Sequence, residues 1–178
     1  MNKKQQQNTG KLKIIPLGGL EQIGMNITAF EYEDSIIVVD CGLAFPEDDM
    51  LGIDLVIPDI SYLKENEEKV KGFFITHGHE DHIGAIPYVM KELNVPIYAT
   101  KLTNGLIENK LKEHGLLTKV KRKVVKYGQH INLGNFRVEF IRTNHSIQDA
   151  AALAIYSPAG IVVHTGDFKV DYTPVYGD

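Results

Sequence analysis

The stretch Phe74-Ile75-Thr76-His77-Gly78-His79-Glu80-Asp81-His82 brings together an unusual number of potential metal ligands. Its four candidates fall within six residues: His77, His79, Asp81 and His82. The apolar run at residues 72–75 is typical of a buried strand, and the apolar segment at residues 83–93 predicts a helix. Imidazole and carboxylate groups suit zinc, manganese or iron(II) better than calcium. A solvated loop explains one histidine but not this spacing, so the stretch predicts a metal centre at a strand-to-helix turn.

The length and composition of the chain indicate one folded domain. The chain has 178 residues, of which 43% are hydrophobic and 24% charged, as in ordinary globular proteins. Residues 1–10 are polar and are interpreted as a disordered tail, so the predicted domain covers residues 11–178. We see no signal peptide and no apolar run of the roughly 20 residues that a membrane span needs. Cys41 is the only cysteine, which excludes an internal disulfide and favours the cytosol.

The remaining patterns predict an α/β fold. Alternating or continuous apolar residues predict strands at residues 11–17, 27–32, 35–40, 96–100, 119–127, 129–133, 136–142 and 161–164. Helical patterns cover residues 61–69 and 102–114, and Gly115 is a suitable C-terminal cap for the second helix. The net charge of −4 gives no sign of a nucleic-acid partner, although a basic groove can exist on an acidic protein. The basic series of residues 119–126 is interpreted as a solvated face rather than a phosphate-binding surface.

Four further residues are candidates for the same site. His145 and Asp167 each follow an apolar strand, so they can converge with the metal-binding stretch at one sheet edge. Asp40 ends the apolar run 36–39, and two roles stay open for it: a turn-forming residue, or an acceptor for the backbone of the metal loop. His164 lies inside a strand, three residues before Asp167, and is interpreted as a supporting histidine rather than a ligand.

In order, Asp40, the run of residues 77–82, His145 and Asp167 resemble the first four motifs of the metallo-β-lactamase superfamily. The flanking stretches resemble one family within it, ribonuclease J, whose branch carries an inserted β-CASP domain. They are residues 17–20, 45–48, 51–54, 56–59, 74–84, 145–147 and 163–169. The resemblance runs from about Lys11 to the C-terminus. Glu21 and Gln148 depart from the family pattern, which affects loop shape rather than the ligands.

The resemblance implies the N-terminal part of an αββα sandwich of the metallo-β-lactamase type. On this reading the β-CASP insertion and the C-terminal domain are absent from the chain. The resemblance implies two zinc ions, with manganese as the alternative metal. One ion is held by His77, His79 and His145, the other is held by Asp81 and His82, and Asp167 lies between the two. The implied catalytic residues are Asp81, His79 and Asp167, through a metal-held hydroxide, while the general acid lies outside this chain.

A second, structural metal site is also implied by the resemblance. The Gly52 carbonyl and the Asp54 carboxylate resemble part of a calcium site that a downstream carboxylate completes, and oxygen ligands suit this hard cation. The ordinary interpretation of the acidic residues 47–49 beside it is a solvated turn.

The function implied is that of a metal-dependent ribonuclease of RNA maturation and decay, both endonuclease and 5′-to-3′ exonuclease. Its expected substrate is single-stranded RNA with a 5′-monophosphate. The expected setting is the cytoplasm, with no membrane partner, in a full-length homo-oligomer or an RNA-decay assembly. The 178 residues alone are expected to be inactive. The alternatives are another hydrolase of this fold, such as a glyoxalase II-like thioesterase or a β-lactamase, and a non-enzymatic metal-binding fragment. A β-lactamase would need an export signal.

Overall fold

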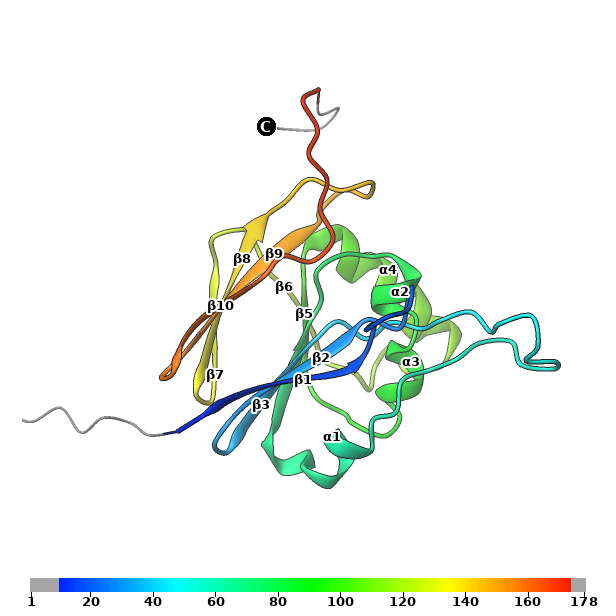
Figure 1. Ribbon diagram of the computed structural model, residues 1–178, viewed down its shortest axis with the longest axis horizontal. Helices are drawn as coiled ribbons and strands as arrows, with labels where there is room; N and C mark the ends of the chain where they lie inside the picture. Colours follow the sequence, from blue (N-terminus) through cyan, green and yellow to red (C-terminus); the bar gives the residue numbers. More distant parts are fainter. Residues whose placement is uncertain (1–9, 174–178) are drawn as a thin grey trace, which may run out of the picture.

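Two groups of strands form two separate sheets in the computed structural model, which describes residues 10–173 (Figure 1). The first sheet has six strands in the order of the chain: β1 Leu12–Gly18, β2 Ile27–Tyr32, β3 Ser35–Val39, β4 Val70–Phe74, β5 Ile97–Ala99 and β6 Arg122–Val124. The second sheet has four strands in the order β10-β9-β8-β7: β7 His130–Leu133, β8 Phe136–Arg142, β9 Ala151–Ser157 and β10 Gly160–His164. The helices are α1 Ser61–Glu65, η1 Glu67–Lys69, α2 Glu80–Ile83, α3 Ile86–Val89 and α4 Lys101–Glu113.

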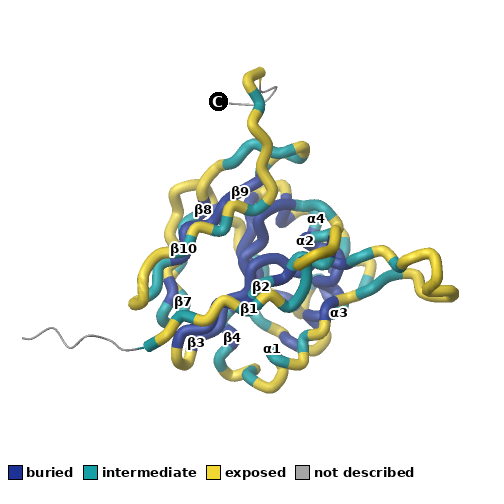
Figure 2. Tube along the Cα trace, viewed as in Figure 1, coloured by how far each residue is buried: buried dark blue, intermediate teal, exposed yellow. Residues whose placement is uncertain are grey.

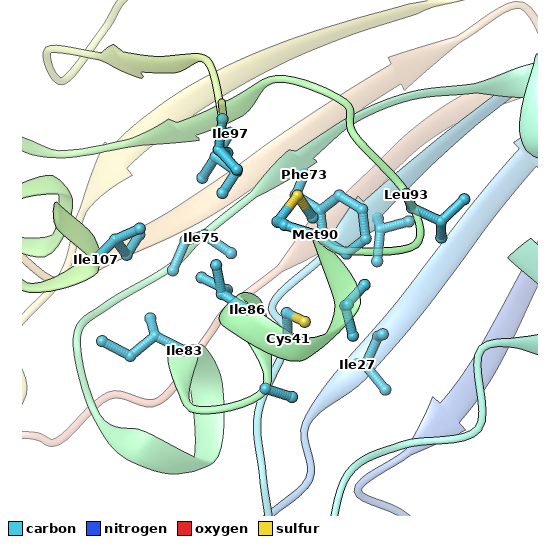
Figure 3. Packing of buried hydrophobic residues seen from close by; sticks show 14 of the residues in the cluster. Ile27, Cys41, Phe73, Ile75, Ile83, Ile86, Met90, Leu93, Ile97 and Ile107 are labelled. Carbon is cyan, nitrogen blue, oxygen red and sulfur yellow. The ribbon is translucent and has the colours of Figure 1, made fainter. Parts of the chain in front are cut away.

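The central strands are buried on both faces because successive side chains of a strand point to opposite sides. On β3, Ile36 and Val38 belong to a core shared with the helices, whereas Ile37 and Val39 belong to a core shared with the second sheet. Figure 3 shows residues of the helix-side core, which include Ile27, Phe73, Ile75, Ile83, Ile86, Met90, Ile97 and Ile107. The six-stranded sheet is therefore the middle layer, and its central strands are mostly dark blue, the colour of buried residues, in Figure 2.

The core between the two sheets is rich in aromatic rings. Phe74 stacks on Tyr98 with ring centroids 4.9 Å apart, and it meets Phe140 of the second sheet at 6.1 Å. Phe136 and Leu153 of the second sheet are fully buried in the same core. Aromatic contacts of this kind add to the hydrophobic effect and hold the two sheets together.

Strand direction brings several chain segments to one edge of the structure. Strands β3 to β6 run parallel, so their C-terminal ends share one edge of the six-stranded sheet. Strands β8 and β10 both lie antiparallel to β9, so their C-terminal ends also share an edge. The two edges meet where the Ala151 amide donates to the Thr76 carbonyl at 2.9 Å. The segments that follow β3, β4, β8 and β10 therefore lie at one place.

The expected α/β fold is confirmed, including the hairpin of residues 27–32 and 35–40. The helix predicted at residues 102–114 occupies Lys101–Glu113, and Gly115 follows it with a φ of +67°. The expected strand at residues 119–127 is shorter and covers only β6. The predicted tail, apart from Gly10, lies outside the described residues.

Two predicted helices are wrong in detail. Of the helix expected at residues 83–93, only Ile83, the last residue of α2, and α3, Ile86–Val89, are helical. Pro87 lies in the first turn of α3 and cannot donate a backbone bond to the preceding turn, so the two helices are not continuous. The expected helix at residues 61–69 is divided into α1 and η1. The division falls at Asn66, whose side chain donates to the Tyr62 carbonyl at 2.9 Å and so competes with the helical backbone.

Strand β9 was not predicted from the sequence. Its first residues are alanines, which have little strand preference of their own and give no alternation of apolar and polar residues. It forms because it lies between β8 and β10, where its small side chains are buried.

The inter-sheet core provides a test of stability. Replacement of Phe140 by Ala should lower the free energy of unfolding by about 3–5 kcal/mol, because it opens a cavity beside Phe74. Urea unfolding followed by circular dichroism measures the change. Replacement of the exposed Ile161 by Ala on β10 is the control, with an expected change of about 0.5 kcal/mol or less. Equal losses in the two variants would contradict this division between core and surface.

Candidate metal centre

The turn after β4 presents the predicted ligands to one point. His77 is buried three residues after the end of β4, and His79 is the extended residue that precedes α2. Asp81 and His82 then lie in the first turn of that helix. Gly78 packs closely against α4, where an added Cβ would lie 2.4 Å from Cδ1 of Leu106. His145, between β8 and β9, and Asp167, after β10, reach the turn from the second sheet.

Three imidazoles form the first candidate group: His77, His79 and His145. The Nδ1 atom of His79 lies 3.1 Å from Nε2 of His77 and 3.2 Å from Nε2 of His145. A tetrahedral zinc ion with bonds of roughly 2.0–2.1 Å separates its nitrogen ligands by about 3.3–3.4 Å. These two separations are close to what a single ion requires, and the three ligand atoms all lie within 4.8 Å of one another. The donor set fits the metal that the sequence predicts.

The second candidate group consists of His77, His82 and Asp167. Nε2 of His82 lies 3.4 Å from Oδ2 of Asp81 and 3.4 Å from Oδ2 of Asp167. The same Asp167 oxygen lies 3.9 Å from Nε2 of His145 in the first group. The two groups share His77, and Asp167 is near both. All six predicted zinc-site residues are therefore brought together in this structure.

Asp40 supports this arrangement from beneath. Its Oδ1 accepts a bond from the Thr76 amide at 2.8 Å, and its Oδ2 lies 2.8 Å from Nδ1 of His82. Of the two roles left open for Asp40, the acceptor role is the one that these contacts describe. Burial alone would raise the pKa of Asp40, but the His82 bond and charge outweigh burial and lower it. The carboxylate directs the second ring nitrogen of His82 toward the site, as metal-ligating histidines require.

The histidines differ in their affinity for protons. Burial and the nearby His82 charge lower the pKa of His77 to about 3. Burial also lowers the pKa of His145. For His82, burial acts in the same direction, but the Asp40 bond and the charges of Asp40, Asp81 and Asp167 raise its pKa to about 9. Neutral imidazole is the form that binds metals, so the lowered pKa values of His77 and His145 favour an ion in the first group, whereas His82 must first lose a proton.

Asn26 is a site residue that sequence reasoning missed. Its Nδ2 donates to the Asp81 carbonyl at 3.1 Å and to Oδ2 of Asp81 at 3.2 Å, and it also lies 3.2 Å from Nε2 of His82. It therefore contacts Asp81 and His82, the two residues predicted to hold the second ion. In the sequence, Asn26 is marked only by its place at the end of the glycine-rich loop before β2, and this position does not indicate which residues it contacts.

The other predicted residues lie outside the two groups. His164 is half-buried at the end of β10, and its Nδ1 accepts a bond from the Gly166 amide at 3.2 Å, next to Asp167. Gly52 and Asp54 lie on an exposed loop that extends from the domain in Figure 1, and their role in calcium binding stays a prediction. In the basic series, Arg122 pairs with Glu108 at 2.9 Å, and the Lys123 ammonium lies over the Tyr98 ring. The four lysines of the series are exposed, as expected of a solvated face, whereas Arg122 is partly buried.

Comparison with known proteins gives consistent results. The Metallo-beta-lactamase superfamily profile matches residues 23–173. Ribonuclease J from Synechocystis is 51% identical over 172 residues, and ribonuclease J from Helicobacter pylori strain 26695 is 50% identical over 165 residues. These matches cover 96% and 92% of this chain but only 27% and 24% of the relatives, so the chain spans about a quarter of their length.

Solved structures resemble this chain in fold. A protein of unknown function from Enterococcus faecalis V583 superimposes with a TM-score of 0.67 and 21% identity, over 89% of this chain and 44% of that one. The metallo-beta-lactamase fold protein YhfI from Bacillus subtilis gives 0.61 and 19%, over 90% and 64%. Within residues 10–173, no helix has the length and hydropathy needed to cross a membrane.

The shifted pKa values predict how the stability of the metal-free protein depends on pH. His82 has a folded pKa of about 9, above its ordinary 6.5, so its contribution is complete below pH 6.5 and is lost as the pH rises toward 9. His77 has a folded pKa of about 3, so stability falls as the pH drops below 6.5 and the unfolded chain takes up the proton. We expect a maximum near pH 6.5. Urea unfolding in the presence of a chelator measures it, and the alkaline decline should be shallower in His82→Gln. An unchanged decline in that variant would contradict the assignment.

Proposed function

The chain belongs to the metallo-beta-lactamase superfamily, and from that premise we propose that it is the N-terminal part of a metal-dependent ribonuclease with a dinuclear zinc site. The observation that carries the proposal is the pair of ligand groups that share His77 and have Asp167 near both. Two adjacent ions are the arrangement that suits phosphoryl transfer, since they activate water and neutralise the charge of the reacting phosphate. The ribonuclease J relatives supply the RNA substrate class.

We assign the protein groups as follows. His77, His79 and His145 hold the first ion through neutral imidazoles, as their separations and the lowered pKa values of His77 and His145 favour. Asp81 and His82 hold the second ion, and Asp167 lies between the two. Asp40 keeps Nδ1 of His82 engaged, so that Nε2 faces the site. Zinc is the preferred metal because imidazole dominates the donor set, and manganese is the alternative.

The substrate is proposed to be single-stranded RNA with a 5′-monophosphate, cleaved by both endonuclease and 5′-to-3′ exonuclease action in cytoplasmic RNA maturation and decay. Because the chain spans about a quarter of its relatives, we place the general acid and the surface that grips RNA in sequence beyond this domain, residues 11–178. Assembly into a homo-oligomer or an RNA-decay complex, and a calcium ion at Gly52 and Asp54, belong to the same proposal.

Metal binding gives the first test. We expect the 178-residue chain to bind one zinc ion tightly and a second ion more weakly, because the second ion must displace the His82 proton. Equilibrium dialysis with elemental analysis gives the stoichiometry. Replacement of His77 by Ala should remove the tight site, with circular dichroism as the check that the variant folds, while His130→Ala, on the exposed start of β7, should bind like the wild type. No tightly bound ion in the wild type would contradict the proposed centre.

Activity gives the second test, in a polypeptide extended to the length of the ribonuclease J relatives. His79→Ala and Asp81→Ala should abolish cleavage of labelled 5′-monophosphorylated RNA, whereas His130→Ala should retain it. The 178 residues alone should give no turnover, because a chain of net charge −4 has little non-specific hold on a polyanion. Turnover of a thioester or a cephalosporin in place of RNA would identify a different hydrolase. Cleavage by the short chain that His79→Ala abolishes would show that this part is sufficient.

A further inference from the structure

His145 is the one member of the first ligand group that lies far in sequence from the 77–82 run. It lies on the loop of residues 143–150, which joins β8 to β9 in the second sheet, whereas His77 and His79 follow a strand of the first sheet. A loop of this length has many conformations unless contacts fix it. The contacts that hold this loop against the first sheet therefore decide whether Nε2 of His145 stays 3.2 Å from His79.

Asp149 makes two of these contacts. Its Oδ2 accepts a bond from the Leu102 amide at 2.9 Å, and its backbone carbonyl accepts a bond from the Thr100 hydroxyl at 2.8 Å. Leu102 lies in the first turn of α4, and Thr100 is the residue that precedes this helix. The side chain of Thr100 makes no capping bond to its own helix, so Asp149, distant in sequence, provides the capping carboxylate. A negative charge at a helix N-terminus is favourable.

The same helix also contacts the metal-binding turn. Gly78 lies between His77 and His79, and a Cβ built on it would be 2.4 Å from Cδ1 of Leu106 on α4 and 3.5 Å from Cδ1 of Ile147 on the His145 loop. Helix α4 is therefore the common support of both ligand-bearing segments. Asp149 bonds the 143–150 loop to the N-terminus of α4, and Leu106 of the same helix packs against Gly78 in the metal-binding turn.

Backbone conformation restricts which residue can make this tie. Asp149 has a φ of +63°, in the left-handed region that asparagine and aspartate adopt more readily than other non-glycine residues. The position needs both this conformation and a side-chain acceptor of the right length. Asparagine meets the two requirements and alanine meets neither, which makes Asn the conservative variant for a test.

We propose that Asp149 is a positioning residue that holds His145 in the first ligand group by fixing the 143–150 loop to the N-terminus of α4. This inference rests on the proposed metal centre and concerns how the first site is built. Residues that orient metal ligands typically change metal affinity by about 10–100-fold when they are replaced. Loss of Asp149 is therefore expected to weaken the first site while the other ligands stay in place.

The test is a cycle of variants of the 178-residue chain, titrated with Co²⁺, whose d–d absorption reports the geometry of its ligands. We expect Asp149→Ala to weaken binding at least tenfold and to alter the spectrum, and Asp149→Asn to restore both. In the His145→Ala background, Asp149→Ala should have no further effect, because the residue on which it acts is gone. The matched control is Asp59→Ala, which removes a carboxylate bound to the Ser61 amide at the start of α1 and should leave Co²⁺ binding unchanged.

The proposal would be overturned if folded Asp149→Ala bound Co²⁺ with wild-type affinity and spectrum. It would also be overturned if Asp149→Ala weakened binding by the same factor in the His145→Ala background as in the wild type. If Asp149→Ala does not fold, Thr100→Val removes the other bond and should weaken Co²⁺ binding, while Thr100→Ser retains the hydroxyl and should not. Wild-type binding by Thr100→Val would then also overturn it. RNA cleavage is measured separately in the extended polypeptide. Absence of RNA cleavage would contradict the proposed function but would not change the Co²⁺ result. Conversely, Co²⁺ titrations that show no role for Asp149 would leave the ribonuclease proposal intact.

Discussion

The buried carboxylate of Asp40 is the group on which the geometry of the site depends. It occupies the end of β3 with a φ of +62°, and one side chain satisfies both the Thr76 amide and the His82 ring. Without it, two buried polar groups would lose their partner, at a cost of about 1–3 kcal/mol each. Its negative charge also keeps His82 protonated until a metal ion competes for the ring. The same carboxylate therefore both fixes the backbone of the metal-binding turn and raises the pKa of His82.

The candidate ligands could be identified in the sequence because four of them lie within six residues of the chain. Their spacing alone indicates a turn, and the apolar run before them places that turn at a strand end. Asn26 and Asp149 could not be predicted in this way. Asn26 acts on Asp81, 55 residues away, and Asp149 acts on Leu102, 47 residues away. A polar residue in a loop has no distinctive local pattern, so only the folded structure reveals its partner.

The fold could be predicted wherever apolar residues have a clear period. The β2–β3 hairpin and α4 occur nearly at the expected residues. The prediction of β9 failed because alanines give no period, and the strand exists through its two neighbours. The helix expected after the metal-binding stretch is interrupted near Pro87, although its apolar residues pack on the same core. Burial was thus easier to predict than the backbone conformation that achieves it.

The candidate ligands come from two layers that pack on each other through an aromatic core. His77, His79, Asp81 and His82 belong to the first sheet and its helix, while His145 and Asp167 belong to the second. An ion bound to both would be a cross-link between the sheets, and its binding energy would oppose their separation. By the same linkage, a substitution in the Phe74–Phe140 contact that populates the separated sheets would lower the apparent affinity for the ion without touching a candidate ligand. Substitutions of apolar residues in the inter-sheet core would thereby change the metal occupancy of a site that they do not contact.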